Sequence, residues 1–193
     1  MNQYVKMILF VIILGTITSV LLLAGDYLTK DLIEENKAAD LKSAILEAND
    51  IAYTFSNIHD VFEEKIDTIE IDGYTFYLDK ASGSVSYLFE GGGVWGPIIG
   101  IITLESDFET ILNVSILQQE ETPGLGGVIA EPGYLSTFVG IKMIPQIEIN
   151  KDTSANAENE IDAITGATRT SKAVELILNN AYAEHKTAWL SQD

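Results

Sequence analysis

DAITGATRTS, at residues 162–171, stands directly before an amphipathic run and gathers small and hydroxylated residues at the entry to a helix. Thr170 or Ser171 is a natural N-cap for that helix, which we expect over residues 171–189. The free N–H groups of a first helical turn and the helix dipole favour a phosphate, and Gly166 lets the backbone approach it closely. The alternative interpretation is a capped helix start that binds nothing.

Two glycine-rich segments come earlier in the chain. ETPGLGG, at residues 121–127, follows a predicted strand and indicates a tight turn whose N–H groups could meet the oxygens of a ligand. GGGVWGP, at residues 91–97, sets Trp95 between glycines, where the indole face could stack on a flat ring. Taken singly, the first segment is a turn and Trp95 is a core residue, so both interpretations stay open.

The remaining pattern predicts the fold class. Residues 69–78 alternate apolar and polar side chains around Asp72 and Gly73, which is typical of a hairpin with a type I′ turn. Further β-rich runs occupy residues 85–89, 98–104 and 110–117. Residues 151–160 are polar and irregular, which indicates a loop. Strands in one block, framed by helices, predict an α+β domain with a mostly antiparallel sheet.

The N-terminal segment is apolar enough to cross a membrane. Residues 7–24 carry no charge, and at about 1.5 Å per residue they nearly span a hydrocarbon core of about 30 Å. A cleaved signal peptide is the alternative, although the LLA at residues 22–24 suits cleavage poorly. We therefore expect an N-terminal transmembrane anchor at residues 1–25, a helical stalk at 26–50 and the domain at 51–193.

Composition excludes several classes of function. The 193-residue chain has no cysteine, so it forms no disulfide, thiolate metal site or iron–sulfur cluster. Its net charge of −18 disfavours nucleic acid. Neither of its two histidines, His59 and His185, stands in a motif with a nucleophile, and no metal-ligand spacing is present. We therefore expect neither a hydrolase nor a metal site.

Taken in order, these segments resemble the FMN-binding domain family, which includes the C subunit of the Na⁺-translocating NADH:quinone reductase and the G subunit of the Rnf complex. The family's flavin-attachment pattern is D-x-x-[ST]-G-A-T, and residues 162–168 match it at each fixed position. ETPGLG, at residues 121–126, is a second hallmark of the family. The G-x-W at residues 93–95 is more similar to the quinone reductase protein.

The resemblance implies a covalent cofactor. Thr168 would be the acceptor, joined through its Oγ to the phosphate of FMN, and a separate Mg²⁺-dependent flavin transferase would attach it. Trp95 and Leu125 would flank the isoalloxazine ring. No residue would be catalytic in the narrow sense. The other expected cofactor-binding residues are Glu121, Thr122, Gly124, Asp162, Thr165, Gly166 and Ala167.

The resemblance also implies a place in the cell. The chain would be a single-pass protein of the bacterial inner membrane, with its flavin domain on the periplasmic or extracellular side. It would transfer electrons beside other integral membrane subunits of an ion-translocating redox pump. Two alternatives stay open: a stand-alone flavoprotein of an anaerobic or extracellular electron-transfer chain, and an anchored binding module that carries no flavin.

Overall fold

The computed structural model describes residues 2–150 and 157–191. The chain divides into two compact units, Met1–Ala39 and Asp40–Asp193. The second unit holds a mostly antiparallel sheet with helices, as the sequence predicted, and the α+β fold class is therefore confirmed.

The first unit is the greater part of one long helix, α1, Gln3–Ala48. Among the described residues, α1 is the one helix long and apolar enough to cross a membrane, with a mean hydropathy of 2.7 in its most apolar window. The hydroxyl of Thr16 donates to the Ile12 carbonyl at 2.9 Å, which satisfies this polar group inside an apolar run. By length and composition α1 fits a membrane anchor.

The end of α1 belongs to the second unit. Ile45 and Leu46 are fully buried in a small core with Ile58, Phe62 and Ile66. The compact unit therefore begins at Asp40, ahead of the boundary expected at residue 51. A short helix that the sequence did not predict, α2 at Ile58–Lys65, supplies part of this core.

The main sheet has five strands in the order β1-β2-β3-β4-β5, all antiparallel. Their bounds are Ile66–Ile71, Tyr74–Asp79, Val85–Gly92, Pro97–Leu104 and Ile111–Gln118. Asp72 and Gly73 join β1 to β2 with φ values of 50° and 84°, as a type I′ turn requires, so the predicted hairpin is confirmed.

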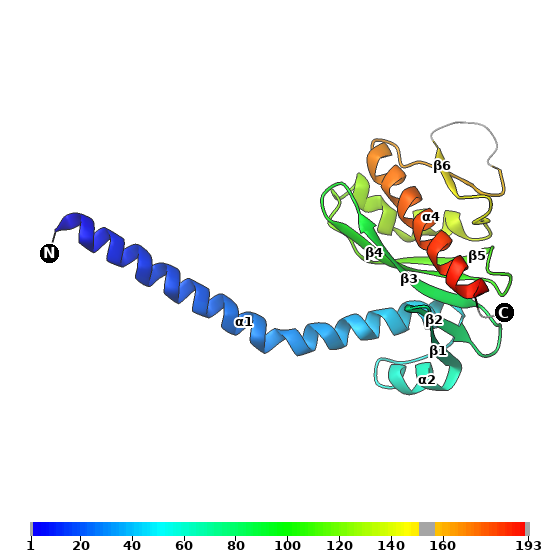
Figure 1. Cartoon of the computed structure of the whole chain (residues 1–193), viewed down its shortest axis with the longest axis horizontal. Helices are drawn as coiled ribbons and strands as arrows, with labels where there is room; N and C mark the ends of the chain where they lie inside the picture. The colour runs from blue at the N-terminus through cyan, green and yellow to red at the C-terminus, as the bar shows by residue number, and fades with distance from the viewer. Residues whose placement is uncertain (1, 151–156, 192–193) are drawn as a thin grey trace. The chain divides into compact units, whose positions relative to one another are not determined.

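The long C-terminal helix α4, Thr168–Leu190, crosses one face of this sheet (Figure 1). It approaches β3 so closely that a Cβ on Gly91 would lie 2.5 Å from Ile177 Cγ1. The main core fills the space between them. Its largest fully buried side chains include Phe76, Tyr87, Phe89, Phe138 and Ile102.

Two short parallel strands, β6 at Glu148–Asn150 and β7 at Glu160–Asp162, form a separate sheet that the sequence did not predict. Of the loop expected at residues 151–160, residues 151–156 lie outside the described part of the chain, and Glu160 already begins β7. Between β5 and β6 lie η1 at Gly126–Ala130, α3 at Pro132–Leu135 and η2 at Ser136–Phe138.

Candidate functional site

The three segments singled out in the sequence meet around one hollow of about 300 Å³. Seven of the expected cofactor-binding residues line it: Trp95, Glu121, Thr122, Leu125, Gly166, Ala167 and Thr168. Four more lining residues were not expected: Val94, Gly126, Arg169 and Thr170. The other expected residues, Gly124, Asp162 and Thr165, are not among the lining residues, although each adjoins a segment that contributes to the hollow.

The start of α4 forms one wall of the hollow. The helix begins at Thr168 with Ala167 as its N-cap, so the expected N-cap at Thr170 or Ser171 is wrong. Its first backbone bond runs from the Ser171 N–H to the Ala167 carbonyl at 3.0 Å. Within the described helix, the N–H groups of Thr168, Arg169 and Thr170 therefore have no intrahelical partner. An exposed Thr168 side chain thus lies beside the free donors of a helix N-terminus.

The two hydroxyls expected to cap the helix bond elsewhere. Ser171 Oγ accepts the Ile164 N–H at 3.1 Å and donates to the Ala167 carbonyl at 3.1 Å, which fastens the incoming chain to the first turn. Gly166 makes the bend before the helix with a φ of +85°, a conformation that side chains disfavour. A Cβ there would lie 3.3 Å from Leu125 Cδ2, so this bend brings the helix start against the glycine-rich turn.

That turn forms the opposite wall. The Thr122 carbonyl accepts the N–H groups of Leu125 at 3.1 Å and Gly127 at 2.9 Å. Gly124 supplies the turn with a φ of +71°, which explains its presence without any contact to a ligand. The Leu125 side chain is 47% exposed at the edge of the hollow.

Trp95 lies on the rim, at the tip of the hairpin between β3 and β4. The Gly93 N–H donates to the Gly96 carbonyl at 2.9 Å, which closes a four-residue turn around it. Its indole is 71% exposed, so the interpretation of Trp95 as a core residue is wrong. Trp95 and Leu125 together present two large apolar surfaces to solvent at the same hollow.

Glu121 connects all three segments. One carboxylate oxygen, Oε1, accepts the backbone N–H groups of Val94 at 2.7 Å and Trp95 at 3.2 Å. The other, Oε2, accepts the hydroxyl of Thr170 at 2.8 Å. The side chain is 5% exposed, so these bonds lie in a dry environment where they are strong.

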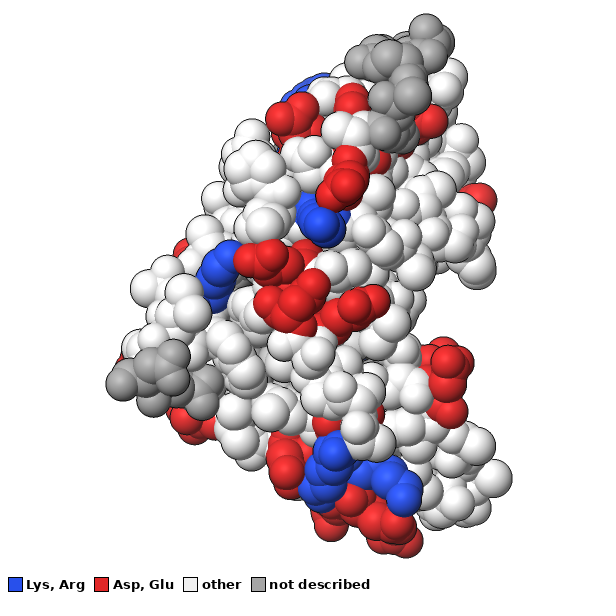
Figure 2. All heavy atoms as spheres, turned by 90° about the vertical axis from the view of Figure 1, so that its right-hand side faces the viewer, with Lys and Arg blue, Asp and Glu red and all other residues white. Residues whose placement is uncertain are grey.

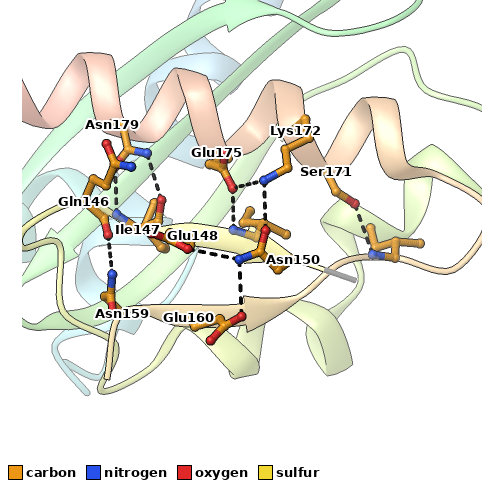
Figure 3. Close-up of polar contacts among 12 residues, drawn as sticks. Gln146, Ile147, Glu148, Asn150, Asn159, Glu160, Ser171, Lys172, Glu175 and Asn179 are labelled. Carbon is orange, nitrogen blue, oxygen red and sulfur yellow. Dashed lines mark hydrogen bonds and ion pairs between the residues drawn. The ribbon is translucent and has the colours of Figure 1, made fainter. Parts of the chain in front are cut away.

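Polar side chains on α4 hold the strand pair that leads into the helix (Figure 3). Asn179 bonds the backbone of Ile147 twice, accepting its N–H at 2.9 Å and donating to its carbonyl at 2.9 Å. Lys172 reaches Asn150 Oδ1 at 3.2 Å and Glu175 Oε2 at 2.7 Å. Because β6 pairs with β7, which runs directly into residues 163–168, these contacts support the helix start.

The charge around the site is predominantly negative. Figure 2 shows acidic side chains in several groups with few basic ones among them on the face it draws. Arg169 is the exception at the hollow, where it is exposed beside Thr168. Burial raises the pKa of Tyr134 to about 12, with Asp162 raising it further and a contact with Ser171 opposing the rise. Tyr134 therefore stays neutral and adds no negative charge near the helix start.

This geometry defines a class of protein. Residues 93–183, which hold the hollow and its three segments, match the FMN-binding domain family, and this part of the chain is an FMN-binding domain. The particular proteins to which the chain is similar belong to one respiratory enzyme. It is 37% identical over 109 residues to the C subunit of the Na(+)-translocating NADH-quinone reductase from Pasteurella multocida, covering 54% of this chain and 39% of that protein.

The C subunit of the same reductase from Haemophilus ducreyi is 37% identical over 90 residues, covering 44% of this chain and 35% of that protein. The chain thus spans less than half the length of these curated relatives. The solved structure of the C subunit from Parabacteroides distasonis matches 78% of this chain and 92% of its own, with a TM-score of 0.67 and 25% identity. NqrC from Shewanella oneidensis has the same TM-score at 19% identity and covers 77% and 93%, which agrees with the fold.

The residues at the hollow fit FMN. A phosphate needs several hydrogen-bond donors, and the first turn of α4 offers free N–H groups with Arg169 next to them. A planar isoalloxazine ring needs apolar surface, and Trp95 and Leu125 expose it at the same hollow. The glycine at 166 keeps the space over Leu125 clear, since a Cβ there would meet this side chain.

Proposed function

We propose that this chain is a membrane-anchored flavoprotein that carries FMN as an ester between its phosphate and Thr168 Oγ1. It would transfer electrons within an ion-translocating NADH:quinone reductase, as the C-subunit relatives suggest. The single observation that carries the proposal is the position of Thr168. Its side chain is exposed at the first residue of α4, inside the hollow that Trp95 and Leu125 border.

Each wall of the hollow then has a task. The N–H groups of the first α4 turn bind the phosphate oxygens, and the helix dipole stabilises their charge. Arg169 adds a positive charge on the solvent side. Trp95 and Leu125 cover the apolar ring and leave part of the hollow open to a partner. The flavin supplies the redox chemistry, and the protein fixes its position and exposure.

An ester bond suits a protein on the outer side of a membrane. A dissociable cofactor lost there would not be readily replaced, whereas an ester holds it without a closed pocket. The α1 helix would fix the chain in the membrane, with the FMN-binding domain on the periplasmic or extracellular side. A separate flavin transferase would recognise residues 162–168 and form the ester.

The test is fluorescence after denaturing electrophoresis, in cells that also make a flavin transferase. The wild-type band should fluoresce, and Thr168→Ala should abolish the signal because the acceptor oxygen is gone. Thr165→Ala is the matched control, since it removes a neighbouring exposed hydroxyl of the same motif and should leave the band. A fluorescent Thr168→Ala band would remove Thr168 from the acceptor role.

The complex is tested by purification in mild detergent. A C-type subunit should bring integral membrane partners that oxidise NADH and reduce quinone. Isolation of the loaded chain alone would favour a stand-alone carrier, and partners that use ferredoxin would favour an Rnf-type complex. A chain that stays colourless beside an active transferase would favour a binding module without flavin.

A further inference from the structure

The Glu121 side chain lies where the three walls of the hollow join, and its two oxygens are occupied by donors of this chain. Oε1 bonds the N–H groups of Val94 and Trp95, at the tip of the β3–β4 hairpin. Oε2 bonds the Thr170 hydroxyl, in the first turn of α4. The sequence had placed Glu121 among the residues that contact the cofactor, but its acceptors are directed into the protein.

Burial makes these bonds matter. Glu121 is 5% exposed, and among the residues that the structure describes no ion pair involves it. A carboxylate taken out of water needs donors to compensate for its lost hydration, and here three donors do so. The reverse also holds, because the Val94 and Trp95 amides would lose their acceptor without Glu121.

The surrounding glycines leave space for this carboxylate. A Cβ on Gly93 would lie 2.5 Å from Glu121 Oε1, and a Cβ on Gly126 would lie 2.6 Å from Oε2 and 2.7 Å from Thr170 Oγ1. Both distances are far shorter than an ordinary van der Waals contact. Two glycines from different segments therefore allow the carboxylate to approach, which ties the glycine-rich sequence to Glu121 as well as to a ligand.

We propose that Glu121 is a positioning residue that fixes the Trp95 hairpin to the start of α4, so that the ring-binding and phosphate-binding walls keep their spacing before any cofactor arrives. It acts through hydrogen bonds to Val94, Trp95 and Thr170 and does not touch the flavin. The inference rests on the proposed function only in naming FMN as the group that the positioned walls receive.

Three substitutions separate geometry from charge. Glu121→Ala removes all three bonds. Glu121→Gln keeps an acceptor oxygen for the two N–H groups and an amide that can donate to the Thr170 hydroxyl, while it removes the charge. Glu120→Gln is the matched control, because Glu120 is exposed, adjacent in sequence, and loses the same charge.

The first measurement needs no flavin. In the full chain, produced without a transferase and held in detergent, hydrogen exchange at the Val94 and Trp95 amides is followed by NMR. We expect Glu121→Ala to speed exchange at both amides by at least about tenfold, because a charge-assisted bond is lost at each. Glu121→Gln and Glu120→Gln should stay within about threefold of wild type, given that bonds are kept in both.

Unchanged exchange in Glu121→Ala would overturn the proposal, and so would Glu121→Gln exchanging as fast as Glu121→Ala. If Glu121→Ala does not fold, Thr170→Val gives the same test with a nearly isosteric side chain. It frees Oε2 only, so exchange at the two amides should rise by a smaller factor than complete loss would give. No rise at all would overturn the link to α4.

The second measurement uses the loaded protein. Visible circular dichroism of the flavin should weaken in Glu121→Ala and be restored in Glu121→Gln, since the signal depends on how Trp95 is held. A wild-type dichroism signal in Glu121→Ala would overturn the positioning role. If no variant and no wild-type chain carries flavin, the proposed function fails, while the exchange measurement still decides the role of Glu121.

Discussion

His185 lies face to face with Tyr87 in the core, with ring centroids 4.1 Å apart and ring planes inclined by 17°. Tyr74 and Phe76 approach the same imidazole edge-on, at 4.7 Å and 5.5 Å. A neutral ring that carries its proton on Nδ1 donates to the Ala181 carbonyl at 2.7 Å. Burial lowers the pKa of His185, although the bond to Ala181 and the charge of Glu184 oppose the shift.

This stack predicts a pH-dependent stability. An unfolded histidine has a pKa of about 6.5, so on acidification the unfolded chain binds a proton before folded His185 does. The free energy of unfolding should therefore fall as the pH drops through about 6.5 toward the lower pKa of the folded state. Its full value should be present above about pH 7.5. Urea unfolding at stepped pH would measure the slope.

The matched variants for this test are His185→Phe and His59→Gln. His185→Phe keeps a ring against Tyr87 and cannot titrate, so its slope between about pH 7.5 and about pH 5.5 should be smaller than that of wild type. His59 is exposed, and His59→Gln should keep the wild-type slope. Equal slopes in wild type and His185→Phe would show that the buried imidazole does not set the pH dependence.

Gly126→Ala should damage the site sterically. Its Cβ would lie 2.6 Å from Glu121 Oε2 and 2.7 Å from Thr170 Oγ1, so at least one of these groups must move. We expect the free energy of unfolding to fall by about 1–3 kcal/mol, together with a loss of flavin loading. Gly133→Ala is the control, since its Cβ meets nothing within 4 Å, and it should be neutral in both measurements.

Asn179→Ala should loosen the support beneath the helix start. The change leaves the N–H and carbonyl of fully buried Ile147 without their side-chain partners. Chemical denaturation should show a loss of about 1–3 kcal/mol, the cost of stranding buried polar groups. Asn180→Ala, one residue further along α4 and exposed, should change stability by less than about 0.5 kcal/mol. Similar losses for both variants would contradict the assigned contacts.

Truncation should separate the anchor from the domain. A chain that starts at Asp40 keeps Ile45 and Leu46 in their core, so we expect it to fold and to stay in solution without detergent. A chain that starts at residue 51 loses both, at a cost on the order of 4 kcal/mol or more, because each large buried residue contributes about 2–5 kcal/mol. Thermal melting compares the two, and equal stability would contradict this boundary.

The fold was predictable where the pattern is long or the turn is specific. The alternating residues around Asp72 and Gly73 predicted the first hairpin, because few other sequences suit two consecutive positive φ values. The strands β6 and β7 escaped prediction. Each is three residues long with one buried isoleucine, at Ile149 and Ile161, which is too short to show a period.

The site was predictable as a set of segments more than as a set of contacts. Hydroxyl residues before a helix usually suggest an N-cap, but Thr170 instead bonds Glu121, which lies in a distant part of the sequence. Nothing local indicates such a bond. Trp95 was ambiguous for the same reason, because its exposure depends on the tip of the β3–β4 hairpin and not on its neighbours in sequence.

The acceptor threonine lies near the C-terminal end of the chain, and the wall opposite it comes from residues translated much earlier. A ribosome must therefore release nearly the whole polypeptide before the surface offered to the transferase exists. Under the proposed chemistry, yellow colour would be acquired only by chains that have already completed the domain. The pigment would then act as a record of successful maturation, and pale protein in the membrane would mark molecules that never assembled this surface.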